Sequence, residues 1–233
     1  MKIVFLGPPG AGKGTYSSRI SKILNIPHIS TGDIFREAIM KRTELGKKVS
    51  DYVKNGDLVP DNVTVAILKE RISQSDCQRG FILDGYPRTV VQAKELEKLT
   101  NLDVVINLEI NENIILKKLS ARRVCKSCGE IYNLADIQET INGIKYSMPP
   151  MLSKKPGICD KCEGELEQRK DDKMNVIRDR LELYRKQTEP LIIYYQKRGL
   201  LKKIIVNAGP DIVVPMIMEK LESLKNDKVD PEI

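Results

Sequence analysis

The 233-residue chain is long enough for one good-sized hydrophobic core and a smaller additional unit. Its 41% hydrophobic and 30% charged residues are ordinary, and no apolar run approaches the roughly 18–20 residues that a membrane-spanning helix needs. The net charge of +7 is spread without a polybasic tail, and with 5% aromatic residues and no Trp there is little sign of a base-stacking surface. We therefore expect a cytoplasmic protein that binds neither membrane nor nucleic acid.

A glycine-rich segment, Gly7 to Thr15, follows a short apolar run at 3–6 that we predict to be a buried strand, and a helical pattern follows it. Glycines let backbone N–H groups converge on an anion, the helix start adds a partial positive charge, and Lys13 adds a full one. The segment matches the P-loop pattern G-x-x-x-x-G-K-[ST] through Lys13, after which Gly14 delays the hydroxyl to Thr15. We predict a nucleotide-binding loop, whose phosphates would also account for the positive charge of the chain.

A predicted short strand near 26–29 leads into a polar turn, and helical patterns follow at 34–40, 45–55 and 63–72. Arg36 falls in the first turn of the first of these helices, where a cation opposes the helix dipole. This placement hints at an anionic ligand, the alternative being a solvated surface arginine. The single histidine, His28, is expected to pack near a strand end rather than to take part in chemistry.

A second apolar strand ends in Asp84 and has the form of a Walker-B strand. Such a carboxylate emerges beside the P-loop and can hold the water molecules around Mg²⁺, whereas the alternative is a buried structural aspartate. Arg88 follows in a loop shaped by Gly85 and Pro87, and a further strand and helix are predicted at 103–110 and 114–119. Strands separated by helical patterns indicate parallel βαβ units, hence a doubly wound α/β sheet with the P-loop at its carboxyl edge.

Four of the five cysteines form two C-x-x-C pairs, Cys125/Cys128 and Cys159/Cys162, whereas Cys77 stands alone. In a reducing compartment such pairs are more often zinc ligands than disulfides. Four sulfur ligands leave no open coordination position, so we predict a structural zinc ion. The segment between the pairs is polar with little apolar periodicity, and we expect the metal, not a core of its own, to stabilise it.

The rest of the chain continues the alternation. A long helical pattern runs from 176 to 195 and is expected to kink or break near Pro190, because proline removes a helical hydrogen bond. A last strand at 201–206, an amphipathic helix at 212–224 and a polar tail at 225–233 complete the chain.

The sequence resembles the adenylate kinases, specifically the long-lid, zinc-containing bacterial type. The resemblance covers essentially the whole chain, and Gly14 before Thr15 is what this family has. The matching motifs lie in Gly7 to Thr15, Ser30 to Arg36, Leu83 to Gln92, Arg122 to Gly129, Cys159 to Cys162 and Arg169 to Asp172.

The resemblance implies an α/β fold with three parts. They are a P-loop three-layer core with a parallel β-sheet (1–30, 60–121 and 172–233), an AMP-binding flap (31–59) and a zinc-binding lid (122–171).

The resemblance also implies the residue roles. The residues implied to bind ATP are Gly10, Ala11, Gly12, Lys13, Gly14, Thr15, Arg122, Ile131 and Tyr132. Those implied to bind AMP are Thr31, Arg36, Asp57, Leu58, Val59, Gly85, Tyr86, Pro87, Arg88, Gln92, Arg169 and Arg180. The residues implied to be catalytic are Lys13, Arg88, Arg122, Arg169 and Arg180. Asp84 is implied to hold the water molecules around Mg²⁺, and Asp171 and Asp172 to take part in lid closure. The implied zinc ligands are Cys125, Cys128, Cys159 and Cys162.

Two features depart from the family pattern. Lys118 stands where the family usually has an arginine against the ATP adenine, and an ammonium lacks the planar stacking face of a guanidinium. In addition, 30 residues separate Cys128 from Cys159, more than the family's usual gap. The extra stretch, within 133–156, would extend the lid.

The implied reaction is ATP + AMP ⇌ 2 ADP, by direct in-line transfer with Mg²⁺ and a structural Zn²⁺ in a monomer. Because the AMP phosphate is already ionised near neutral pH, the reaction needs cations and exclusion of water rather than a general base. The alternatives are another nucleoside monophosphate kinase (GTP:AMP or UMP/CMP) and, from a different class, a nucleic-acid-binding NTPase with a zinc ribbon. Thr31 and Gln92 favour AMP.

Overall fold

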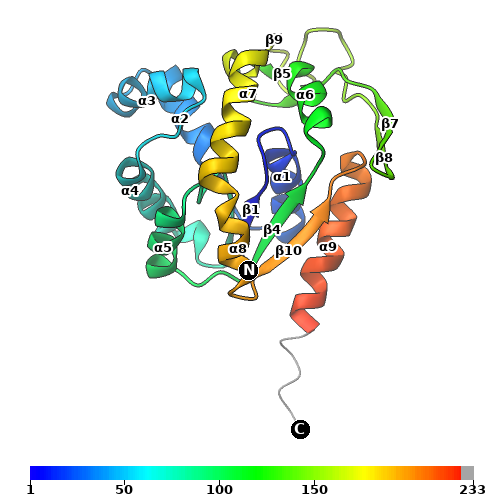
Figure 1. Ribbon diagram of the computed structural model, residues 1–233. Helices are drawn as coiled ribbons and strands as arrows, with labels where there is room; N and C mark the ends of the chain where they lie inside the picture. Colours follow the sequence, from blue (N-terminus) through cyan, green and yellow to red (C-terminus); the bar gives the residue numbers. More distant parts are fainter. Residues whose placement is uncertain (227–233) are drawn as a thin grey trace.

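A five-stranded parallel sheet forms the centre of the computed structural model, which describes residues 1–226 (Figure 1). Residues 227–233, the end of the predicted polar tail, lie outside the described residues. The strand order is β10-β4-β1-β3-β2, and every pairing is parallel. The strands are β1 (Lys2–Leu6), β2 (His28–Ser30), β3 (Phe81–Asp84), β4 (Val104–Glu109) and β10 (Leu201–Ile205).

Helices surround this sheet and connect its strands. Their bounds are α1 (Lys13–Leu24), α2 (Thr31–Met40), α3 (Glu44–Asn55), α4 (Asp61–Ile72), α5 (Val90–Leu99), α6 (Glu112–Ser120), α7 (Met174–Leu183), α8 (Pro190–Gln196) and α9 (Pro210–Asn226). The expected break near Pro190 takes the form of a π-helical turn at Tyr184–Thr188, between α7 and α8.

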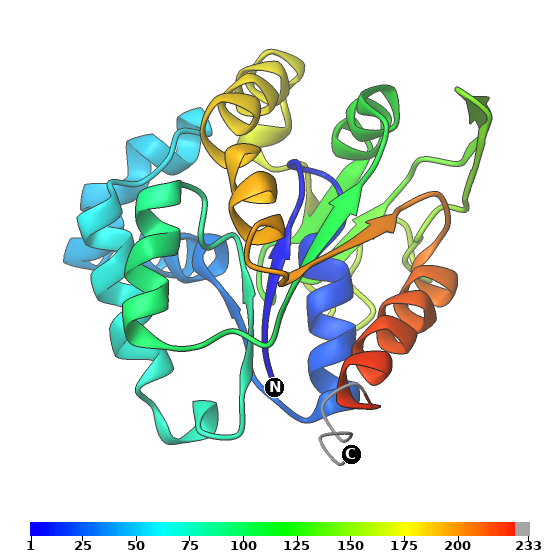
Figure 2. The ribbon, with the colours of Figure 1, turned by 60° about the horizontal axis from the view of Figure 1, so that its bottom comes forward.

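Alternate side chains of β1 enter two separate hydrophobic clusters, because successive strand residues point to opposite faces. Ile3 and Phe5 pack with residues of α1 and α9, whereas Val4 and Leu6 pack with residues of α4, α5 and α8. All four are buried. The sheet is therefore covered by helices on both faces, which confirms the predicted three-layer α/β architecture (Figure 2).

Two small antiparallel sheets lie between α6 and α7 in the sequence. The first, in the order β6-β5-β9, consists of β5 (Arg122–Cys125), β6 (Ile131–Asn133) and β9 (Leu166–Glu167). The second is a hairpin of β7 (Ile137–Ile141) and β8 (Ile144–Met148), which lies beside the N-terminal end of α9 in Figures 1 and 2.

The hairpin differs from the sequence expectation. The segment between the cysteine pairs was expected to have little apolar periodicity and to be stabilised by the metal, but Ile137, Tyr146 and Met148 are buried in the same cluster as Val213 and Ile217 of α9. The hairpin therefore packs against the central core, and that expectation is wrong for residues 137–148.

Candidate active site

The P-loop joins β1 to α1 with glycines in conformations that other residues rarely adopt. Gly10 and Gly12 have φ of 83° and 97°. A Cβ at Gly12 would lie 2.7 Å from the Tyr16 ring, and one at Gly10 would lie 2.8 Å from Leu119 Cγ. Glycine is therefore required at both positions by strain and by close approach. Lys13 Nζ donates hydrogen bonds of 2.7 and 2.9 Å to carbonyls within the loop.

Asp84 ends β3 beside the P-loop, as expected for a Walker-B residue. Its Oδ2 would lie 3.2 Å from a Cβ placed on Gly14, so the absence of a side chain there lets the carboxylate approach the helix start. His28, predicted to be a packing residue, places Nε2 3.5 Å from the same oxygen. The β2–β3 register pairs His28 with Ile82 and Ser30 with Asp84. His28 and Asp84 are therefore diagonal neighbours on adjacent strands, which brings the imidazole and the carboxylate together. No local sequence signal could have shown this proximity.

Basic side chains from separate parts of the chain converge on one cavity. It is lined by Lys13, Arg36, Arg88, Arg122, Arg169 and Arg180. Burial together with Arg88 and Arg180 lowers the pKa of Lys13 to about 7, although Asp84 acts in the opposite direction. Burial and Arg180 likewise lower the pKa of Arg88 to about 10. The site thus disfavours its own positive charges and is suited to a ligand with several negative charges.

Arg169 is the clearest example of a cation whose positive charge is disfavoured in the ligand-free site. Burial and the neighbouring Arg36 and Arg122 lower its pKa to about 9, although Asp33 and Asp171 oppose the shift. Within residues 1–226, its buried Nε has no hydrogen-bond partner. A buried donor without a partner is costly, so this guanidinium is available for an acceptor that the protein does not provide.

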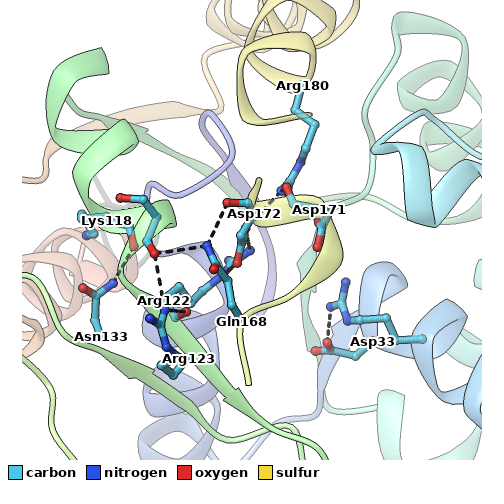
Figure 3. A network of polar contacts seen from close by, with 11 residues as sticks. Asp33, Lys118, Arg122, Arg123, Asn133, Gln168, Asp171, Asp172 and Arg180 are labelled. Atoms are coloured by element: carbon cyan, nitrogen blue, oxygen red, sulfur yellow. Dashed lines mark hydrogen bonds and ion pairs between the residues drawn. The ribbon is translucent and has the colours of Figure 1, made fainter. Parts of the chain in front are cut away.

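Two adjacent carboxylates hold two of the arginines (Figure 3). Asp172, whose side chain has no exposed surface, accepts hydrogen bonds of 2.8 and 2.6 Å from Arg122 Nε and Nη2. Asp171 lies 2.9 Å from Arg180, which also approaches Asp172 at 3.5 Å. Burial would raise the pKa of Asp171, but Arg180 and Arg122 outweigh it and lower that pKa. Asp171 and Asp172 therefore connect Arg122, at the start of β5, to Arg180 in α7.

The cavity extends from the P-loop toward two ends. The flap end is lined by Arg36, Leu58 and Gly85. A second pocket shares these residues and lies between α2, α3 and α5, where it is also lined by Thr31, Phe35, Asp57, Val59 and Gln92. Arg36 borders this end and forms an ion pair with Asp33, but it lies in the second turn of α2. The first-turn placement expected from the sequence is therefore wrong, because Ser30 caps α2 by accepting a hydrogen bond from Asp33 N and the helix begins at Thr31.

The hairpin end lies on the other side of the P-loop. Its lining includes Lys118, Ile131, Asn133, Ile137, Met148 and Ala208. Burial lowers the pKa of Lys118 to about 8. The sequence offered the hairpin residues only as part of an extended lid, and it did not indicate that they reach this cavity.

Most residues predicted for nucleotide binding line this cavity or the pocket beside it at the flap, whereas Ala11, Tyr86 and Tyr132 line neither. Ala11 is a buried residue of the P-loop, and its N–H donates to Pro8 O at 3.2 Å. Tyr86 is fully buried and donates to Gln92 O at 3.0 Å. Tyr132 directs its hydroxyl toward the cysteines, 3.6 Å from Cys159 Sγ.

The four cysteines of the C-x-x-C pairs form one cluster, with all sulfur atoms within 4.8 Å of one another. Sulfurs in a tetrahedral zinc site with bonds of about 2.3 Å lie roughly 3.8 Å apart, so the spacing fits zinc. Burial raises the pKa of Cys159, but hydrogen bonds from Tyr132 and the Lys161 backbone outweigh it and lower the pKa to about 6. This favours the thiolate that a metal requires at Cys159, although burial raises the pKa of Cys128 to about 12.

Comparisons with known proteins agree with this geometry. Residues 5–200 match the family model described as adenylate kinase. The chain is 50% identical to the adenylate kinase of Thermosipho africanus over 91% of this chain and 94% of that protein. It is 45% identical to the adenylate kinase of Archaeoglobus fulgidus over 96% of this chain and all of that protein. Within residues 1–226, no helix is both long and apolar enough to cross a membrane. The chain belongs to the adenylate kinase family and is a nucleoside monophosphate kinase that transfers phosphoryl groups between adenine nucleotides.

Proposed function

We propose that the protein transfers a phosphoryl group directly from MgATP to AMP, giving two ADP without a covalent enzyme intermediate. The observation that carries this proposal is the cavity that runs from Arg36 and Leu58 at the flap to the hairpin, with the P-loop and the converging arginines between its ends. A second pocket adjoins it at the flap. A cavity with two arms and a cationic middle suits two nucleotides whose phosphates meet.

The residues then divide into three groups. The P-loop from Gly10 to Thr15, with Lys13, holds the ATP phosphates, and Arg122 and Ile131 lie on the same side. Thr31, Arg36, Arg88 and Gln92 hold AMP at the flap end, with the backbone of 57–59 and 85–87 alongside. Arg169 and Arg180 contact the phosphoryl group in transit, where charge spreads over three oxygens.

The cationic centre also explains how two anionic reactants can approach. Lys13, Arg88 and Arg169 all have lowered pKa values, so bound phosphates relieve repulsion that already exists among them. Bidentate arginines orient the reacting groups in line, and exclusion of water prevents simple hydrolysis of ATP. Asp171 and Asp172, which hold Arg180 and Arg122, are the residues that we assign to lid closure.

Two metal ions fit the residues present. Asp84 beside the P-loop suits Mg²⁺ held through water, and Mg²⁺ bound to ATP would neutralise part of its phosphate charge. The cluster of Cys125, Cys128, Cys159 and Cys162 suits a structural Zn²⁺ that fixes the sheet of β5, β6 and β9. We keep the division into core, flap (31–59) and lid (122–171) as a proposal, together with the monomeric state and the cytoplasmic location.

A coupled assay across nucleoside triphosphate donors and monophosphate acceptors tests this function. We expect ATP and AMP to be the preferred pair, and Arg88→Ala to lose several kcal/mol of transition-state binding, since it removes a buried cation that would contact phosphate. A preference for GTP as donor, or for UMP or CMP as acceptor, would select the alternative kinases. Near-normal kcat/KM in Arg88→Ala would refute the role of that residue.

A further inference from the structure

The hairpin of β7 and β8 is joined to the central core by several kinds of contact. Ser147 N donates to Asn207 O at 2.8 Å, and Asn207 Nδ2 donates to Lys145 O at 3.2 Å. Lys117 of α6 pairs with Glu139 of β7 at 2.7 Å. The hairpin is thus attached both to the loop between β10 and α9 and to α6, which border the cavity.

The register of the hairpin places two apolar side chains at its open end. Ile137 and Met148 are directly paired across the strands, so they lie side by side. Their exposed fractions are 3% and 5%, and both line the cavity. Ala208 and Gly209 line it beside them, and a Cβ on Gly209 would lie 3.6 Å from Pro149. The side of the recess formed by the hairpin and by residues 208–209 is therefore apolar, whereas Lys118 and Asn133 are the polar residues of the same end.

The recess lies on the donor side of the P-loop. The flap, with Thr31 and Gln92, occupies the other end, and Figures 1 and 2 both show α2 and α3 across the P-loop from the hairpin. On the proposed function, a nucleotide whose phosphates occupy the P-loop directs its base away from the flap. We propose that Ile137 and Met148 form one wall of the donor base subsite and contact the base of ATP.

This wall recognises the base by shape and apolar area. Neither Ile137 nor Met148 has a strong hydrogen-bonding group. The nearby Asn133 donates to Lys118 O at 2.8 Å and accepts from Ala135 N at 2.9 Å, so the protein already uses one of its two N–H groups and one lone pair of its oxygen. The hairpin should therefore strengthen the binding of a base-bearing donor without affecting a bare polyphosphate.

Calorimetric binding of ATP and of inorganic tripolyphosphate, each with Mg²⁺, to the full chain tests the proposal. We expect Met148→Ala to weaken ATP binding roughly tenfold, the scale of losing apolar contact in a pocket, while tripolyphosphate binding changes less than about twofold. Ile144→Ala is the matched control, because Ile144 packs against the same core cluster from the same hairpin but is not among the lining residues. It should leave both affinities unchanged.

A smaller change protects the test against misfolding. Ile137→Val removes one methylene, and it should weaken ATP binding by roughly two- to threefold and spare tripolyphosphate. Equal losses for both ligands, an unchanged ATP affinity in both lining variants, or the same loss in Ile144→Ala would overturn the proposal. A wild-type protein that binds ATP but makes no ADP from ATP and AMP would instead contradict the proposed function, and the two failures are thus distinguishable.

Discussion

Replacing Arg169 with methionine should make the ligand-free protein more stable and the enzyme much slower. The pKa of Arg169 is lowered from 12.5 to about 9, chiefly by burial and by Arg36 and Arg122. Because the folded pKa lies below the unfolded one, the cost of this charge is fully present below about pH 9 and is lost as the pH rises toward 12.5. At pH 7 the variant is therefore relieved of a cost that the wild type carries.

The magnitude follows from the same shift. At about 1.4 kcal/mol per pKa unit, the upper bound is roughly 5 kcal/mol, and solvent screening of a partly exposed side chain reduces this to about 1 kcal/mol. For a chain of this length, that corresponds to a rise in melting temperature of about 2–4 °C. Within residues 1–226 the Arg169 Nε has no hydrogen-bond partner, so its removal breaks no protein contact at that atom.

The effect on catalysis has the opposite sign. Losing charge-assisted hydrogen bonds to a phosphoryl group costs about 2–4 kcal/mol, or roughly 30- to 1,000-fold in kcat/KM. Differential scanning calorimetry without ligand and a coupled assay with ATP and AMP measure the two effects. Arg123→Met is the matched control, because Arg123 donates to the carbonyls of Ser120 and Arg122 instead of facing the cavity (Figure 3). It should not raise the melting temperature, and kcat/KM should change little.

A fall in both melting temperature and activity on Arg169→Met would refute the reasoning, since it would make Arg169 a structural residue. Unchanged kcat/KM would remove its assigned role in catalysis. Rising stability with falling activity is the pattern of a site whose charges are arranged for a ligand.

Three further predictions follow from the contacts. Since the pKa of Lys13 is lowered to about 7, this amine is mostly neutral at pH 8 and should take up nearly one proton when tripolyphosphate binds. Calorimetry in two buffers of different ionisation enthalpy measures the proton uptake. Uptake that persists in Lys13→Arg would contradict this assignment. Protein purified without chelator should contain about one zinc per chain, and Cys125→Ser should lower the melting temperature while leaving residual activity; absence of zinc would remove the metal assignment. Gly46→Ala should destabilise the protein by about 1–3 kcal/mol or more, because its Cβ would lie 2.1 Å from Ala38 O; an unchanged denaturation midpoint would show that α2 and α3 can separate at no cost.

The parts of the site that depend on local sequence motifs could be predicted from the sequence. The P-loop, the strand ending in Asp84 and the cysteine pairs each need a fixed spacing, and the structure places them as expected. The ion pair of Arg122 with Asp172 was not predictable, because it joins the start of β5 to the turn before α7, 50 positions along the chain. The contact of the Tyr132 hydroxyl with Cys159 was not predictable for the same reason, because it forms only when the cysteine cluster is folded.

The hairpin was missed despite a readable signal. Asn142 and Gly143 both have positive φ, of 51° and 78°, and an Asn-Gly pair between alternating residues is a strong hairpin indication. What the pattern could not show is where the buried face of the hairpin packs, because that depends on Val213 and Ile217 of α9, more than 60 residues away.

The cations of the site fall into two classes, and the difference bears on how the protein keeps so much positive charge in one cavity. Arg122 and Arg180 have carboxylate partners in Asp172 and Asp171, which offset their burial while no ligand is bound. Within residues 1–226, Lys13 has only backbone carbonyls as hydrogen-bond partners and the Arg169 Nε has none. On the proposed function, the paired arginines give the site its shape and the unpaired cations supply the binding energy, because only the latter gain their first anionic hydrogen-bond partner from the phosphates.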